Sequence, residues 1–346
     1  MDAARPFAPS WLDVVMGGIR RLPVPAWLVY LVVGLLLSLT RSIVGWVDGS
    51  YPAGTFFHIH VFDGLFPLYF LFVIHYLDDL AGRALADYRP KLTGDTGYDE
   101  LRYRLTTMPA AWTLVVSLFG FALGAVYLQI FLSPKDLHIS KYFTSPTSVV
   151  VDTTLSGLLG LMMVLFAWHT IRQLRMISRI YTHHTTVSIF DVGALYALSR
   201  VTAVTAVALL FFSYIYLAFY ANGQIYSVSN VVVLGVILLV AVLTFILPLW
   251  GAHRLLQKDR SRRIGDIGRH IETAANALHA QVDAAPSSAD MDHLNNALNG
   301  LISERTLVSK ASTWPWEPEA VRAVITAVLL PIFIWLVTRV LTTLGF

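Results

Sequence analysis

Seven runs of apolar residues, each long enough to cross a bilayer, constrain this chain more than any other feature of its sequence. A transmembrane helix needs roughly 20 apolar residues at about 1.5 Å per residue. Hydrophobic residues make up 56% of the 346 residues and charged residues 14%, against about 45–50% and about 25% in soluble domains. The sequence therefore predicts an all-α membrane protein with spans at 26–47, 55–77, 110–132, 147–170, 201–221, 230–250 and 320–343.

The basic residues orient these spans. Seven spans place 21 of the 25 Lys and Arg on one side of the membrane and only Lys135 and Lys141 on the other, while Arg41 and Arg339 fall inside spans. Because basic loops stay in the cytoplasm, we expect a cytoplasmic N-terminus and an outer C-terminus. The first span lacks a signal-peptide cleavage pattern, so we expect it to be retained in a multi-pass protein of the inner (plasma) membrane.

The span pattern divides the chain into three parts: a six-helix bundle (1–250), a cytoplasmic helical hairpin (251–313) and a seventh transmembrane helix (314–346). Each half of the hairpin carries an apolar stripe at helical spacing, with Pro286 between the halves. A lone amphipathic helix cannot bury its stripe. The stripes therefore pack on each other, on the cytoplasmic ends of the spans, or on another subunit.

Charged residues inside the spans are the first candidates for a functional site. Arg41 and Asp63 lie at matching depths in the first two spans, and an unpaired charge there is costly, so we expect them to form an ion pair. Four further titratable residues lie at the same outer level: His58, His60, Asp152 and Arg339. They form either a structural ion pair with interfacial neighbours or a water-accessible vestibule.

The last span combines a proline with hydroxyl side chains. Pro331 removes one backbone hydrogen bond and leaves the carbonyl four residues earlier to a neighbour or to water. We expect either a static kink or a pore-lining helix that also exposes Thr338 and Thr342. In the fifth span, Ser213, Tyr214 and Tyr216 fit an interfacial belt or a cavity for an apolar ligand.

Other kinds of chemistry find little support in the residues. The absence of Cys excludes disulfides, thiolate metal sites and Cys nucleophiles. The His residues do not form a ligand set of known spacing, and no catalytic or nucleotide-binding motif is present in a supporting context. A net charge of +3 does not indicate nucleic acid. We therefore expect no metal, no cofactor and no enzyme activity, with the lipid bilayer and further copies of the chain as partners.

Three stretches together resemble a family of uncharacterised bacterial multi-pass inner-membrane proteins: Tyr98 to Pro109, Ser188 to Ser199, and Trp314-Pro-Trp through Leu330-Pro331 to Trp335. The resemblance implies an integral inner-membrane protein and no particular chemistry. The predicted topology is also similar to that of the insect gustatory and odorant receptor channels, whose last helix lines the pore of a tetramer. Their C-terminal Thr-Tyr…Gln-Phe signature is missing here, because the chain ends Leu-Thr-Thr-Leu-Gly-Phe346.

Three functions fit these features. An oligomeric channel or ligand-responsive pore would use the hairpin for assembly and the last helix near the pore. A membrane sensor or scaffold would act through the hairpin. A secondary transporter would use the outer charged cluster, although such proteins commonly contain an internal repeat, and none is visible in this sequence. We favour the channel.

Overall fold

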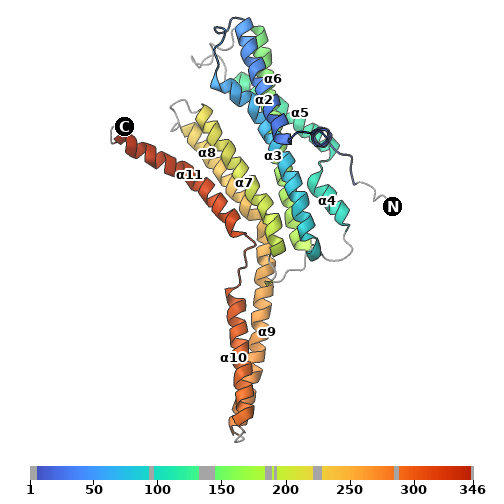
Figure 1. Ribbon diagram of the computed structural model, residues 1–346, viewed down its shortest axis with the longest axis vertical. Coiled ribbons are helices and arrows are strands. Elements are labelled where there is room, and N and C mark those ends of the chain that lie inside the picture. The colour runs from blue at the N-terminus through green and yellow to red at the C-terminus, as the bar shows by residue number, and fades with distance from the viewer. Residues whose placement is uncertain are drawn as a thin grey trace.

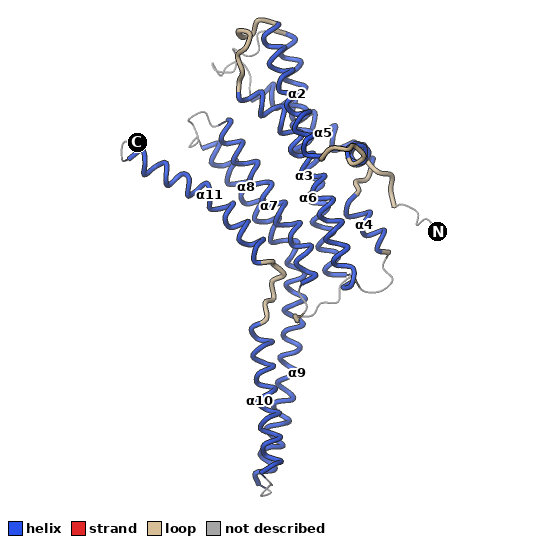
Figure 2. The backbone as a smooth tube through the Cα atoms, viewed as in Figure 1, coloured by secondary structure: helices blue, strands red, loops and turns tan. Residues whose placement is uncertain are grey.

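The computed structural model describes residues 6–92, 97–131, 145–183, 189–190, 193–220, 228–283 and 288–343. Its regular elements are helices (Figures 1 and 2), and an isolated β-bridge joins Pro9 to Pro109. The helices are α1 (Trp11–Ile19), α2 (Ala26–Val47), α3 (His58–Tyr88), α4 (Tyr98–Thr106), α5 (Ala110–Phe131), α6 (Pro146–His183), α7 (Gly193–Tyr220), α8 (Val228–Ile246), α9 (Trp250–Asp283), α10 (Ser288–Lys310) and α11 (Pro318–Thr343). Short 3-10 turns are η1 (Arg89–Lys91) and η3 (Leu247–Leu249).

Five helices in the described residues are long and apolar enough to cross a membrane: Ala26–Val47, His60–Lys91, Pro146–Thr182, Leu195–Ile215 and Gly235–Ala280. A shorter apolar helix, Ala110–Val126, lies within α5. The all-helical fold expected from the sequence is confirmed, and several long apolar helices suit an integral membrane protein. The count of seven spans and their orientation stay predictions.

Helices α3 and α7 form the centre of the bundle. One face of α3 is buried along its whole length, from Phe62 through Ile74 to Tyr88, and packs on α2, α6 and α7. The rings of Phe66 and Phe70 lie 5.3 and 4.9 Å from the ring of Phe212 on α7. Because this apolar face continues beyond residue 77, α3 runs about three turns further than the predicted span.

Two helix pairs approach so closely that only small residues fit between them. A Cβ on Gly124 of α5 would lie 2.2 Å from the backbone oxygen of Ser156 on α6, and one on Gly120 would lie 2.8 Å from that of Gly160. Between α2 and α3, a Cβ on Gly64 would lie 2.6 Å from the backbone nitrogen of Ser38. Small residues four apart are typical of packed helices in membranes, and these contacts fix how α2, α3, α5 and α6 face one another.

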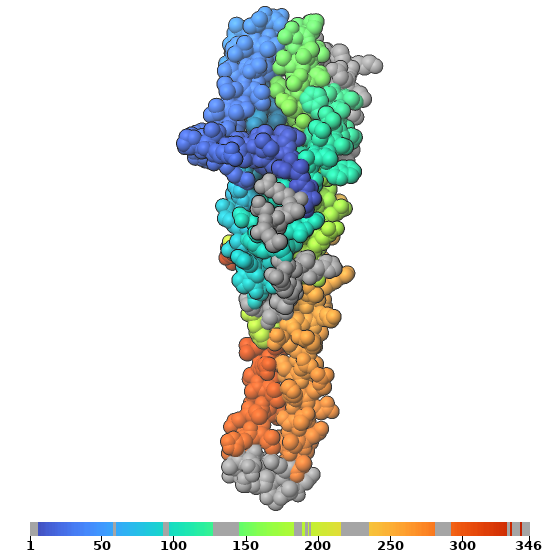
Figure 3. Space-filling view, turned by 90° about the vertical axis from the view of Figure 1, so that its right-hand side faces the viewer, coloured from blue at the N-terminus to red at the C-terminus, as the bar shows by residue number. Residues whose placement is uncertain are grey.

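Helix α8 continues through η3 into α9, and α9 pairs with α10 in a hairpin that projects from the bundle (Figures 1 and 3). Near the bundle the hairpin stripe is buried, with Ile267 at 5% and Val308 at 0% exposure. Further out, Ile271, Leu294 and Leu298 are only half-buried. Below, "hairpin side" means the end of the bundle from which α9 and α10 project, and "far side" means the opposite end.

Candidate functional site

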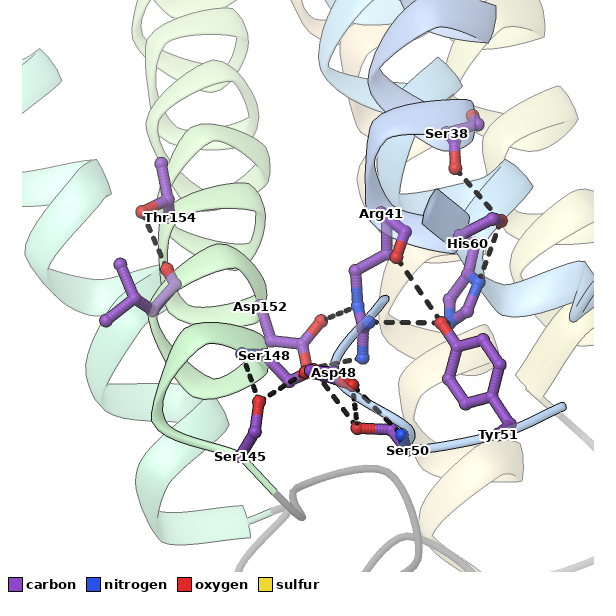
Figure 4. A network of polar contacts seen from close by, with 12 residues as sticks. Ser38, Arg41, Asp48, Ser50, Tyr51, His60, Ser145, Ser148, Asp152 and Thr154 are labelled. Atoms are coloured by element: carbon purple, nitrogen blue, oxygen red, sulfur yellow. Dashed lines mark hydrogen bonds and ion pairs between the residues drawn. The ribbon is translucent and has the colours of Figure 1, made fainter. Parts of the chain in front are cut away.

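A buried arginine is the centre of a polar network on the far side (Figure 4). Arg41 on α2 is 1% exposed and pairs through two nitrogens with the carboxylate of Asp152 on α6; its Nη2 lies 2.8 Å from Oδ2. Its Nη1 donates to the hydroxyl of Tyr51 at 3.1 Å. A bidentate pair of this kind holds both charges in one geometry, so it ties α2 to α6.

Tyr51 connects this ion pair to α3. Its hydroxyl donates to the backbone carbonyl of Arg41 at 3.3 Å and lies 3.4 Å from Nε2 of His60. The other ring nitrogen of His60 lies 3.3 Å from the hydroxyl of Ser42. The ring of Tyr51 fits over Gly45, where a Cβ would come within 2.0 Å of it. The loop after α2 is thereby folded back over the buried arginine.

Asp48, the residue directly after α2, forms the rim of the network. It accepts from the backbone and the hydroxyl of Ser50, at 3.0 and 2.5 Å, and from the hydroxyls of Ser145 and Ser148 at the start of α6. Burial by itself would raise the pKa of Asp48, but the four hydrogen bonds outweigh it and hold that pKa below its usual range. The carboxylate thus anchors the end of α2 to the start of α6.

The structure brings together three of the predicted far-side residues, Arg41, His60 and Asp152. The predicted pairing of Arg41 with Asp63 is wrong, since the ion pair of Arg41 is formed with Asp152. Matching depths say nothing about the direction in which a side chain leaves its helix, and Arg41 lies on the face of α2 that meets α6. The side chains of His58 and Arg339 lie outside the described residues.

Several members of the network were missed by the sequence analysis. Tyr51, Asp48 and Gly45 lie at or after the end of the first span, where polar residues and glycine look like ordinary loop chemistry. The run Asp48-Gly49-Ser50-Tyr51, directly after a span that carries an arginine in its last two turns, is the signal that could have found them. Among the described residues, no three His, Asp or Glu gather in a way that could hold a metal ion.

A second buried polar cluster lies toward the hairpin side, between α3 and α6. Nε2 of His169 lies 2.9 Å from Oδ1 of Asp78, and the amide of Gln173 donates to the same oxygen at 3.2 Å. All three side chains are buried, and Oδ2 of Asp78, Nδ1 of His169 and Oε1 of Gln173 have no hydrogen-bond partner within the described part of the chain. The sequence analysis did not pair His169 with Asp78.

The contact between α7 and α11 supplies a donor for the carbonyl that Pro331 leaves without its helical hydrogen bond. The hydroxyl of Tyr214 on α7 donates to the backbone carbonyl of Ala327, the carbonyl four residues before Pro331. The hydroxyl of Ser213 bonds within its own helix, to the carbonyl of Leu210 at 2.7 Å. The hydroxyls of Ser213 and Tyr214, expected in an interfacial belt or a ligand cavity, therefore bond to backbone carbonyls. The side chains of Tyr216, Pro331, Thr338 and Thr342 lie outside the described residues.

Polar and aromatic contacts hold the beginning of α11. Arg200 on α7 forms two 2.5 Å hydrogen bonds with Glu317, and these bonds hold the pKa of Glu317 below its usual range. In the linker between α10 and α11 (tan in Figure 2), the ring of Trp314 stacks at 3.9 Å on that of His253 and at 4.4 Å on that of Trp316. The base of α11 is therefore fixed to α7 and to the start of α9.

Comparisons of the chain with protein-family models, with curated proteins and with solved structures found no match. The resemblance to bacterial multi-pass proteins and the topological similarity to insect receptor channels stay predictions from the sequence.

Proposed function

We propose that this chain is one subunit of an oligomeric membrane channel, in which α11 lies beside the pore and the α9–α10 hairpin helps to assemble the subunits. The observation that carries the proposal is the position of α11. This helix packs on α7 at the edge of the bundle and leans away from α8 toward its C-terminal end (Figure 1). An edge helix is available to a neighbouring subunit, whereas a helix inside the bundle is not.

The outward surface of α11 supports this assignment. Ile325, Leu329 and Phe333 are 52%, 53% and 63% exposed. This apolar surface suits lipid or an adjacent subunit. The two threonines that follow, Thr338 and Thr342, are four residues apart and so share one face of the helix. A helix with an exposed apolar first part and hydroxyl side chains near its end suits a pore-lining helix that contacts lipid or protein along its first part and water near its end.

The hairpin supports an oligomer. A projecting pair of helices buries its stripe completely only near the bundle, and the residues toward its tip stay half-buried. On α10, Ile302 and Leu307 are 48% and 65% exposed. Hairpins from several copies, gathered around one axis, would cover these residues, because apolar surface is removed from water when helices associate.

The far-side network gives less support to a transporter that uses these charges as an ion site. Arg41 and Asp152 neutralise each other, and Tyr51 covers them from the loop side. Charges that are paired within one chain hold two helices together and leave neither charge to bind a transported ion.

Native mass and conductance test the proposal. We expect the wild-type particle in nanodiscs to contain several copies, and the double variant Ile302→Ser, Leu307→Ser to have a smaller mass with unchanged helix content. Cys placed singly at Thr338 or Thr342 should react with a membrane-impermeant thiol reagent, and the reaction should alter conductance of reconstituted vesicles. The chain has no native Cys, so the background is silent.

Leu239→Cys on α8 is the matched control, because Leu239 is 58% exposed on an apolar helix and should stay unreactive in lipid. A monomeric wild-type particle would contradict the proposal. An oligomer that shows neither labelling nor conductance would contradict the pore and favour a sensor or scaffold that acts through the hairpin.

A further inference from the structure

The proline in α11 creates a defined chemical need at one backbone atom. In an α-helix, the amide of each residue donates to the carbonyl four residues earlier. Pro331 has no amide hydrogen, so the carbonyl of Ala327 loses its donor within the helix. In an apolar environment such a carbonyl must find another donor, because no water is present to replace the missing bond.

Tyr214 supplies that donor from the neighbouring helix. Its hydroxyl bonds to the carbonyl of Ala327, and both residues pack against an apolar cluster that includes Leu210, Phe245 and Val324. The buried members of this cluster have apolar side chains. The bond thus satisfies two groups at once, a tyrosine hydroxyl and a proline-orphaned carbonyl.

This bond is a polar tether between α7 and α11. Another polar contact joins Arg200 to Glu317, directly before α11 and ten residues before Ala327. Helix α11 diverges from α8 toward its C-terminal end (Figure 1). Tyr214 therefore contacts α11 at the level where the helix loses its own hydrogen bond.

We infer that Tyr214 is a positioning residue that holds α11 against α7 at its proline and sets the direction of the segment that follows. The consequence for a pore rests on the proposed function: a tyrosine hydroxyl on α7 would then set how far the end of the pore helix stands from the bundle. The tether itself does not depend on that function.

A double-mutant cycle tests the tether. Tyr214→Phe removes only the hydroxyl, and Pro331→Ala restores an amide that can donate to Ala327 within the helix. We expect Tyr214→Phe to lower the melting temperature in detergent by about 2–4 °C in the wild-type background, as for the loss of one hydrogen bond. In the Pro331→Ala background, the same change should cost less than half as much.

A distance measurement separates positioning from plain stability. Spin labels on Leu239→Cys in α8 and Phe333→Cys in α11 report the divergence of the two helices, and both sites are exposed, at 58% and 63%. Tyr214→Phe should broaden the distance distribution, and adding Pro331→Ala should narrow it again. Ser213→Ala is the matched control, because that hydroxyl bonds within α7 and its loss should leave the distribution unchanged.

Equal costs of Tyr214→Phe in the two backgrounds, or an unchanged distance distribution, would overturn the inference. Failure of the proposed function gives a different result. The double-mutant cycle would then show coupling between Tyr214 and Pro331, while the particle is monomeric or lacks conductance. Conversely, an active oligomer without coupling between Tyr214 and Pro331 would leave the channel standing and remove the tether.

Discussion

At the scale of single residues, polar atoms carried into an apolar bundle determine specific contacts between helices. The guanidinium of Arg41 reaches the carboxylate of Asp152 across two helices, and the hydroxyl of Tyr214 reaches the orphaned carbonyl of Ala327. Each partner comes from a helix remote in sequence. Such contacts select one arrangement among many that would bury the same apolar surface, because only that arrangement leaves these groups paired.

The pair of Arg41 and Asp152 gives a prediction at this scale. Arg41→Leu or Asp152→Leu alone should destabilise the protein by about 3–5 kcal/mol, because each leaves one buried charge without its partner. The double Leu variant should lose less than the sum of the two single variants. Thermal unfolding in one detergent measures all three, and strictly additive losses would show that the two charges do not interact.

At the scale of helices, small residues decide which faces meet. Gly120 and Gly124 on α5 oppose Ser156 and Gly160 on α6, and the backbones approach within the space of a single Cβ. The spacing of four residues puts these small residues on one face of each helix. This spacing of small residues was visible in the sequence, but the sequence analysis did not use it to pair α5 with α6.

Gly124→Ala tests this packing. The added Cβ would meet the backbone oxygen of Ser156 at 2.2 Å, so the helices must shift, and we expect a loss of about 1–3 kcal/mol of stability. Gly235→Ala on α8 is the control, because a Cβ there meets nothing within 4 Å. Unfolding in detergent compares the two variants. Equal stability of Gly124→Ala and Gly235→Ala would contradict the close approach of α5 and α6.

At the scale of the whole molecule, a narrow hairpin projects from a wider helical bundle (Figure 3). The rings of His253, Trp314 and Trp316 stack where the hairpin meets the bundle. The bundle carries the exposed apolar surface of α2, α5, α8 and α11, as expected for helices that face lipid. The hairpin also exposes charged side chains, among them Arg262, Arg269 and Asp266. This contrast suits a molecule that lies partly in a bilayer and partly in water.

The predicted orientation of the molecule rests on the 21 basic residues that seven spans would place on one side of the membrane. We expect a reporter fused after Phe346 to be active only in an extracytoplasmic format, and one inserted at Pro286 only in a cytoplasmic format. Matched fusions of the same two reporters at both positions provide the comparison. The reverse pattern, or activity of one reporter at both positions, would refute seven spans with an outer C-terminus.

The sequence by itself determined the features that depend only on residues close together in the chain. Helical character follows from apolar runs of sufficient length, the hairpin stripes from spacing, and the orphaned carbonyl from the missing amide of Pro331. Each of these depends on residues within a few turns of one another, so it can be read without knowing where other helices lie.

The tertiary structure decided which partners meet. Depth along two helices suggested Asp63 for Arg41, whereas the structure pairs Arg41 with Asp152; it also connects Asp78 to His169 and Tyr214 to Ala327. The reason is rotational: a helix places its side chains every 100° around its axis, and the face turned toward a neighbour depends on how the helices pack. Here the close approaches at Gly64, Gly124 and Gly160 set those rotations.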